Sequence, residues 1–151
     1  MAEAQIPDGL TADYANLEVR AAIEALQATP DYTHLAEFLN ALRSGFLIVD
    51  VTGTPKKKST RIRTIRSTKG QLLLPLFTSM DQLRSALPRG QAAGAKGAIM
   101  PIAEALRLIH SDRFVAAQFD AGSAALVVLR KYLDLALSDA PIDAAAVEAL
   151  R

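Results

Sequence analysis

The sequence lacks cysteine and tryptophan, and aromatic residues make up only 5% of its 151 residues. Without cysteine, the chain can form no disulfide, thiolate metal site or cysteine nucleophile, which fits a reducing compartment. The longest uninterrupted apolar run is 124–129, far shorter than the roughly 18 residues that a membrane-spanning helix requires. We therefore expect no membrane insertion.

The first residues also lack the features of a signal peptide, because 1–9 contains neither a basic segment nor a following apolar segment. This predicts a cytoplasmic protein. Residues 1–13 are expected to form a flexible leader. Residues 14–151 are expected to form one domain, since a chain of this length buries about 68 to 70% of its unfolded surface.

No acidic residue occurs between Val51 and Met80, although the net charge of the whole chain is only +1. That segment holds seven cations, namely Lys56, Lys57, Lys58, Arg61, Arg63, Arg66 and Lys69. A basic hairpin over 56–69 is one hypothesis for contact with anions or nucleic acid. No aromatic residue follows Val51 until Phe77, so such binding would be indifferent to base sequence. A solvated loop explains the same cations more simply.

Groups for catalysis are few. His34 and His110 are the only imidazoles, and His110 is expected to cap the end of a helix. Ser123 follows a glycine but lacks the second glycine of a hydrolase elbow. The segment 53–59 lacks the glycine that precedes the lysine of a phosphate-binding loop. His110 and Asp112 give at most two metal ligands, so the sequence predicts no enzyme, metal site or cofactor.

Apolar periodicity predicts two amphipathic helices at the start of the domain. The first runs over 12–28, and the second begins at Pro30 after a Thr29 cap and ends at Gly45. Branched and apolar runs then predict strands over 46–51, 60–66 and 72–78.

Helices and strands alternate in the remaining sequence. A short helix is predicted over 80–87, a strand over 98–100, a helix opening at Pro101 and a strand over 114–119. Residues 126–129 fit either a strand or a first helical turn; we favour a strand followed by a helix from Lys131. Asp143 is expected to cap a final short helix. This order predicts an α+β fold: a single layered domain in which two N-terminal helices pack on a mixed sheet, with further short helices.

The segment from Leu72 to Ser79 predicts a strand that leads directly into a helix. Ser79 and Gln82 have the spacing of a capping box. Thr78 and Ser79 can act as structural helix caps or line an anion site, and a cap explains them without a ligand. Because Pro75 cannot donate to a β-ladder, the strand is predicted to be an edge locally or to contain a bulge. A second copy of the chain could cover such an edge, giving a homodimer.

The chain resembles the SseB N-terminal domain family over about residues 14–138. The resemblance rests on Asn16-Leu17, Phe38-Leu39, the strand 46–49, the run Leu74-Pro75-Leu76-Phe77-Thr78-Ser79 and the turn Asp120-Ala121-Gly122. Many relatives carry a proline where this turn has Ala121. The resemblance implies a bacterial, cytoplasmic protein with a layered α+β fold, and it supplies no enzymatic activity and no catalytic residue.

These observations lead to one functional prediction and one alternative. The prediction is a non-enzymatic protein-interaction or adaptor domain with a protein partner, without cofactor or metal. The alternative is binding of anions or of nucleic acid, without sequence preference, through the basic hairpin 56–69.

Overall fold

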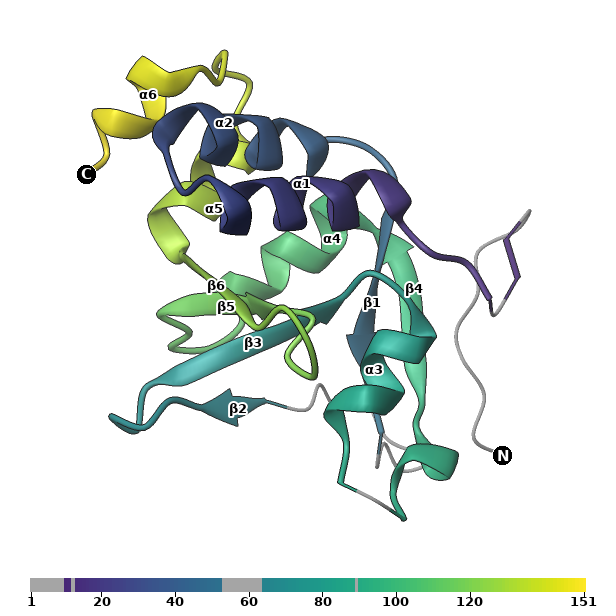
Figure 1. Cartoon of the computed structure of the whole chain (residues 1–151). Coiled ribbons are helices and arrows are strands. Elements are labelled where there is room, and N and C mark those ends of the chain that lie inside the picture. The colour runs from purple at the N-terminus through teal and green to yellow at the C-terminus, as the bar shows by residue number, and fades with distance from the viewer. Residues whose placement is uncertain (1–9, 12, 53–63, 89) are drawn as a thin grey trace.

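A computed structural model describes residues 10–11, 13–52, 64–88 and 90–151 (Figure 1). The elements in chain order are α1 (Leu17–Ala28), α2 (Tyr32–Ala41), β1 (Phe46–Asp50), β2 (Ile65–Arg66), β3 (Leu72–Phe77), α3 (Met80–Ala86), η1 (Ala92–Gly94), β4 (Gly97–Pro101), α4 (Ile102–Arg107), η2 (Leu108–His110), β5 (Ala116–Phe119), β6 (Leu126–Leu129), α5 (Arg130–Leu137) and α6 (Ala144–Glu148). The α+β prediction with two leading helices is confirmed.

The strands form one mixed sheet in the order β4-β1-β3-β5-β6, with β2 paired to part of β3. The β3 and β5 strands run parallel, and every other pair is antiparallel. As a result, the carboxyl ends of β3 and β5 lie at the same edge of the sheet. At one side of the sheet β6 is the outermost strand.

The two faces of the sheet carry separate apolar clusters. Helices α1, α2, α4, α5 and α6 pack on one face, where Phe38 and Phe119 meet edge to face with ring centroids 5.1 Å apart. Helix α3 packs on the other face through Met80 and Leu83. Leu10, within the predicted leader, also contacts this second cluster; residues 1–9 and 12 lie outside the described part of the chain.

The boundaries of the first two helices differ from the prediction. Helix α1 begins at Leu17 because Asn16 caps it, accepting the Val19 N–H at 3.0 Å. Helix α2 is capped by Asp31 rather than Thr29, and Asp31 Oδ1 accepts the His34 N–H at 2.8 Å. It ends at Ala41, before the predicted Gly45.

Pro75 lies in an inner strand, but among the described residues it is paired only with Gln118 of β5, so the prediction that β3 is an edge locally is confirmed on the other side of the strand. The Leu76 carbonyl accepts the Asp120 N–H at 2.9 Å, which directs the backbone groups of even-numbered β3 residues toward β5. The backbone nitrogen of Pro75 therefore points to the side of β3 away from β5, at the place where the partner strand changes from β2 to β1. No ladder donor is needed there, and pairing of this local edge with a second copy of the chain stays a prediction.

The ambiguous segment is a strand, as favoured from the sequence. Residues Leu126–Leu129 form β6, and α5 begins at Arg130, one residue before the predicted Lys131. Asp143 caps α6 and accepts the Ala146 N–H at 2.8 Å. No helix among the described residues is long and apolar enough to cross a bilayer.

Candidate functional site

Most of the predicted basic contact residues lie outside the described part of the chain, namely Lys56, Lys57, Lys58, Arg61 and Arg63. Of the other two cations, Arg66 lies in β2 and Lys69 in the following turn, and both are exposed. The Arg66 guanidinium donates to the Gly70 carbonyl at 2.8 Å. The structure therefore describes only one end of the predicted basic hairpin.

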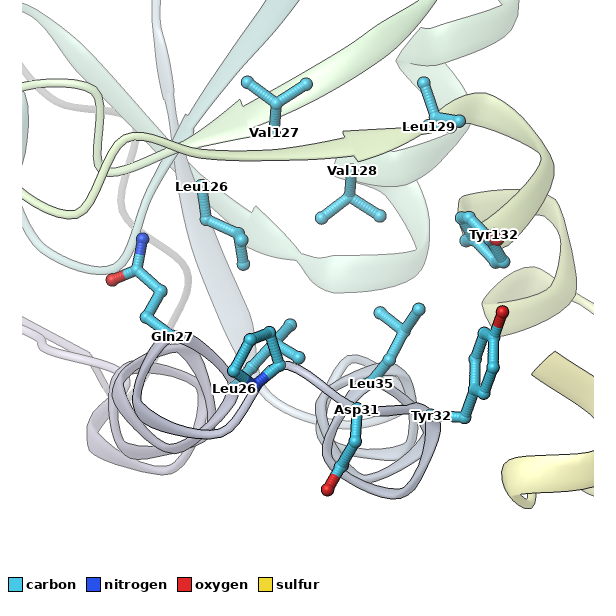
Figure 2. Close-up of a pocket in the computed structure, with 11 residues that line it drawn as sticks. Leu26, Gln27, Asp31, Tyr32, Leu35, Leu126, Val127, Val128, Leu129 and Tyr132 are labelled. Carbon is cyan, nitrogen blue, oxygen red and sulfur yellow. The ribbon is translucent and has the colours of Figure 1, made fainter. Parts of the chain in front are cut away.

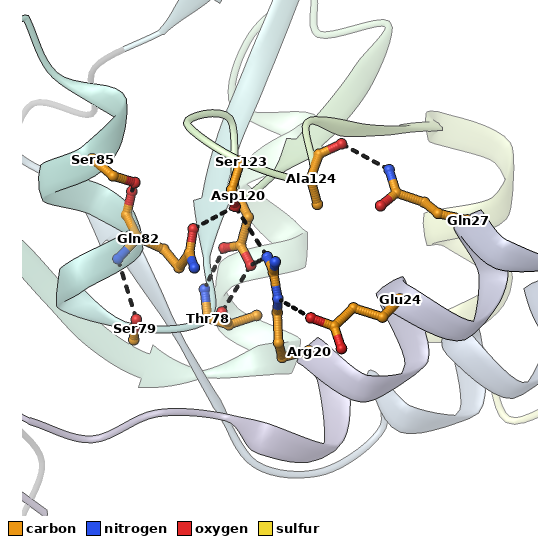
Figure 3. A network of polar contacts seen from close by, with 10 residues as sticks. All are labelled: Arg20, Glu24, Gln27, Thr78, Ser79, Gln82, Ser85, Asp120, Ser123 and Ala124. Atoms are coloured by element: carbon orange, nitrogen blue, oxygen red, sulfur yellow. Dashed lines mark hydrogen bonds and ion pairs between the residues drawn. The ribbon is translucent and has the colours of Figure 1, made fainter.

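Thr78 lies at the end of β3 and is bound to a carboxylate within the same chain. Its side chain is buried, and both its N–H and its Oγ1 donate to Asp120, each at 2.8 Å. Asp120 is completely buried, and Arg20 Nη1 of α1 donates to its Oδ2 at 2.8 Å (Figure 3). We call Arg20, Thr78 and Asp120 the polar junction.

Topology explains why these residues meet. Thr78 follows β3 and Asp120 follows β5, and these two strands are parallel neighbours, so the residues after them lie at the same edge of the sheet. Asp120 has a φ of 52°, a left-handed conformation that aspartate tolerates better than most residues. The hydrogen bond to Asp120 raises the pKa of Arg20 above its ordinary value. An external anion would meet a carboxylate already bound to the Thr78 donors.

Ser79 is the N-cap of α3, since its Oγ accepts the Gln82 N–H at 3.2 Å. The Gln82 side chain does not return to Ser79 as in a complete capping box. Instead its Oε1 accepts the Ser123 hydroxyl at 2.6 Å, which ties α3 to the turn after Asp120. Arg20 Nη1 donates to the same Ser123 oxygen at 3.1 Å.

Gly122 lets this turn lie directly against α3. A Cβ atom at this position would stand 2.6 Å from the Ser85 carbonyl carbon and 2.7 Å from the Ala86 nitrogen, both backbone atoms. A side chain there would have to push the turn and the helix apart. Glycine is therefore required for close packing at Gly122.

A second feature, an apolar groove, lies beside the outermost strand. It has a volume of about 730 Å³ and separates β6 from the α1–α2 connection (Figure 2). Its walls are Leu26, Gln27, Pro30, Asp31, Tyr32 and Leu35 on the helix side, and Leu126, Val127, Val128, Leu129 and Tyr132 on the other. Figure 2 shows Gln27 near one end and the two tyrosines at the other. The Asp31 carboxylate points away from β6, which leaves the interior of the groove without a charged side chain.

The wall formed by β6 exposes both apolar side chains and backbone groups. Val127 and Leu129 are each 47% exposed. The Arg130 N–H donates to the Val115 carbonyl at 3.1 Å. By the alternation of an antiparallel pair, this turns the backbone groups of Leu126 and Val128 toward β5 and those of Val127 and Leu129 toward the outer edge.

The polar junction and the groove share helix α1. Arg20 binds Asp120, and two turns later Gln27 Nε2 donates to the Ala124 carbonyl at 2.7 Å (Figure 3). Ala124 lies two residues before β6. These contacts fix α1 relative to the segment that leads into β6, and so they set the separation of the two groove walls.

Both histidine rings lie within hydrogen-bond distance of charged side chains. His34 Nδ1 lies 2.7 Å from its cap residue Asp31. His110 lies in η2, with Nε2 at 2.8 Å from Asp134 and Nδ1 at 2.7 Å from Arg130, both on α5. The ring of His110 thus binds side chains of α5 rather than the free helix carbonyls expected from the sequence. No group of three or more potential metal ligands occurs among the described residues.

Comparison with known proteins places the chain in a family. The profile of the SseB protein N-terminal domain matches residues 19–133, which is most of the chain. The protein belongs to the SseB N-terminal domain family. No curated protein and no solved structure matches the chain.

The match to the SseB domain encloses both features of this site. It begins just before Arg20, includes Thr78 and Asp120, and ends just after Tyr132. The run Leu74 to Ser79 and the Asp120 turn, separate in the sequence, are thus joined in this SseB domain by the contacts of Thr78 with Asp120.

Sequence reasoning missed two parts of the site in the SseB domain. It named the Asp120 turn without giving Asp120 a partner, because the partner follows from the parallel pairing of β3 with β5. It predicted 126–129 as a strand without showing that this strand is the outermost one. The sequence did contain a signal for the polar junction: Thr78 directly follows one buried strand, and Asp120 directly follows another.

Proposed function

We propose that this SseB domain is a non-enzymatic protein-interaction domain that binds a partner protein in the groove beside β6. The supporting observation is the combination of a groove of about 730 Å³ with an exposed apolar strand. Among the described residues, the large hydrophobic side chains that are exposed are Leu17, Val127 and Leu129, and two of these three lie on β6. Exposed apolar surface next to a groove is typical of interaction sites.

The polar junction supports a structural role for the charged groups near the groove. The buried donors of Thr78 and the guanidinium of Arg20 are bound to Asp120. No described side-chain nitrogen or oxygen is buried without a hydrogen-bond partner. A substrate would therefore have to displace contacts that hold the fold together. Turnover of a substrate that is lost when a groove residue is mutated would contradict the non-enzymatic proposal.

Site-specific photocrosslinking tests the proposed function. A photoreactive amino acid is placed at Tyr132 in the groove or, as a control, at Leu17, which is 75% exposed and does not line the groove. We expect a discrete adduct from Tyr132 alone in the host cell. The crosslinked protein, once purified, should bind the wild-type domain and bind Val127→Asp weakly. Equal adducts from both positions, or unchanged binding to Val127→Asp, would contradict the proposal.

The basic segment supports a second candidate function, binding of anions or nucleic acid, because the seven cations between Val51 and Met80 include no compensating acid. If about six of these cations contacted duplex phosphates, the logarithm of the affinity would fall with the logarithm of salt concentration at a slope of about −5. Replacement of Lys56, Lys57 and Lys58 by alanine should make the slope shallower by about three. A flat salt response in the wild-type protein would remove this candidate.

A further inference from the structure

We propose that the groove binds its partner as an added β-strand: an extended segment pairs with the outer edge of β6, directs alternate apolar side chains into the groove and carries an acidic residue at the Tyr132 end. This inference rests on the proposed function and specifies the chemistry of the partner. It depends on three observations, which concern the backbone of β6, the lining of the groove and the charge at one end.

The backbone of β6 favours an extended polypeptide over a helix or a small ligand. The N–H and C=O of Val127 and the N–H of Leu129 point to the outer edge, and no hydrogen bond to a described residue is formed there. The Leu129 carbonyl is placed to accept the first bond of α5, for which Leu129 is the N-cap. Three backbone groups in one row along an apolar groove are complementary to a second extended backbone.

The lining of the groove determines the side-chain pattern of the partner. Residues of an added strand that lie beside Leu126 and Val128 direct their side chains toward the helix wall, where Leu26 and Leu35 lie (Figure 2). These positions should be apolar. The intervening residues lie beside Val127 and Leu129 on the other face, which is half exposed, so polar side chains are accepted there.

A cation at one end of the groove gives the partner its charge preference. The Lys131 ammonium lies 5.3 Å from the centroid of the Tyr132 ring, and Tyr132 lines the groove. Within the described part of the chain, Lys131 forms no salt bridge. Because the groove interior carries no charged side chain, Lys131 supplies the electrostatic preference at this end. An acidic side chain or a terminal carboxylate is the complementary group.

Selection from a displayed library of short linear peptides provides the probe. The full chain is immobilised, and the enriched peptides are synthesised and their affinities measured by fluorescence anisotropy. We expect apolar residues at alternate positions and an acidic residue toward one end. Enrichment of helix-forming sequences with apolar residues three and four apart would overturn strand addition while leaving the proposed function intact. Enrichment of no peptide above background would overturn the inference, and the crosslinking experiment then decides separately on the proposed function.

A matched pair of variants tests main-chain pairing. Val127→Pro removes the outward N–H without removing a bond to β5, whereas Val127→Ala shortens the side chain and keeps the N–H. We expect Val127→Pro to weaken binding of a selected peptide at least about tenfold more than Val127→Ala does. Equal losses in the two variants would show that the peptide is not held by the β6 backbone. Thermal unfolding of both variants shows whether each one is folded.

Methylation of the peptide backbone gives the same test without changing the protein. N-methyl groups at alternate residues should abolish binding when they face β6 and be tolerated at the positions between. A tolerance pattern without this period of two would contradict strand addition.

Lys131→Glu should reverse the preference for an acidic residue and favour a basic residue at the same peptide position. An unchanged preference would remove the assigned role of Lys131.

A second copy of the chain is the main competing occupant, because β6 itself has four consecutive apolar residues. Light scattering across a range of protein concentrations distinguishes a second copy of the chain from a separate partner segment. A monomer that binds one peptide supports the inference. A dimer that is dissociated by Val127→Pro, and that binds no peptide, would overturn it.

Discussion

The polar junction and the groove both include residues of helix α1, but the junction buries charged groups whereas the groove adjoins exposed apolar side chains. In the junction, a fully buried carboxylate accepts three hydrogen bonds from Thr78 and Arg20. Beside the groove, on the face of β6 away from the helices, the side chains of Val127 and Leu129 are each 47% exposed, and their backbone N–H groups face the outer edge. The charged residues of the junction thus serve the fold, and the apolar strand β6 is the surface that we propose for a partner.

The largest expected effect follows from removing the carboxylate of the junction. Asp120→Ala leaves the buried donors of Thr78 without an acceptor and removes the buried one of the two carboxylates that pair with Arg20, so it should lower the free energy of unfolding by about 3 kcal/mol. Asp120→Asn is the matched control, because asparagine also accepts a left-handed backbone and keeps one acceptor oxygen. It should cost about 1 to 2 kcal/mol. Urea denaturation of the three proteins measures both values.

This prediction would be contradicted if Asp120→Ala were as stable as the wild type. That result would mean that the junction contributes nothing to folding and that its buried carboxylate has another purpose. Weaker peptide binding by Asp120→Asn, under conditions in which this variant is fully folded, would link the junction to the groove. It would show that the junction controls the width of the groove through α1.

The groove should respond in the opposite way. Val127→Thr keeps the shape of a side chain that is already half exposed, so the free energy of unfolding should change by no more than about 0.5 kcal/mol. Binding of a selected peptide should nevertheless weaken, because the hydroxyl replaces apolar contact area with the partner. Titration calorimetry and urea denaturation of the same sample test the two halves of the prediction. A large loss of stability with unchanged binding would place Val127 in the core and not in an interface.

These two regions also differ in how far the sequence predicts them. A short apolar run after the turn 120–123 favours a strand at 126–129, and the spacing of Ser79 to Gln82 predicts the cap at Ser79. Both are local signals. The contact of Thr78 with Asp120 and the outermost position of β6 depend on the order of strands, which is a property of pairing between distant segments. Pro75 shows the same limit, since its place in an inner strand is acceptable only because β3 changes partner there.

The smallest expected effect concerns Asp31, which lines the groove but directs its carboxylate to its own helix. Hydrogen bonds from the His34 backbone N–H and then from its ring lower the pKa of Asp31 below the ordinary value of 3.8. A depressed pKa in the folded state stabilises the protein above the unfolded value, and this contribution is lost as the pH falls through the lower folded value. Asp31→Asn keeps a capping oxygen but cannot ionise.

The stability difference between wild type and Asp31→Asn should therefore favour the wild type at about pH 6 and shrink as the pH is lowered below about 3.8. Thermal unfolding of both proteins across this range measures it. Peptide binding should be the same in both, because the carboxylate points away from the groove. A difference in stability that grows on acidification would contradict the assignment of the pKa shift to these hydrogen bonds.

Amide hydrogen exchange of β6, with and without a selected peptide, tests whether the partner pairs with the outer edge of β6. In the free protein, the amide of Val128 should exchange slowly because it faces β5, and the amides of Val127 and Leu129 should exchange quickly. Addition of the peptide should protect Val127 and Leu129 and leave Val128 unchanged. A bound peptide that leaves the exchange of Val127 and Leu129 unaltered would contradict strand addition at β6.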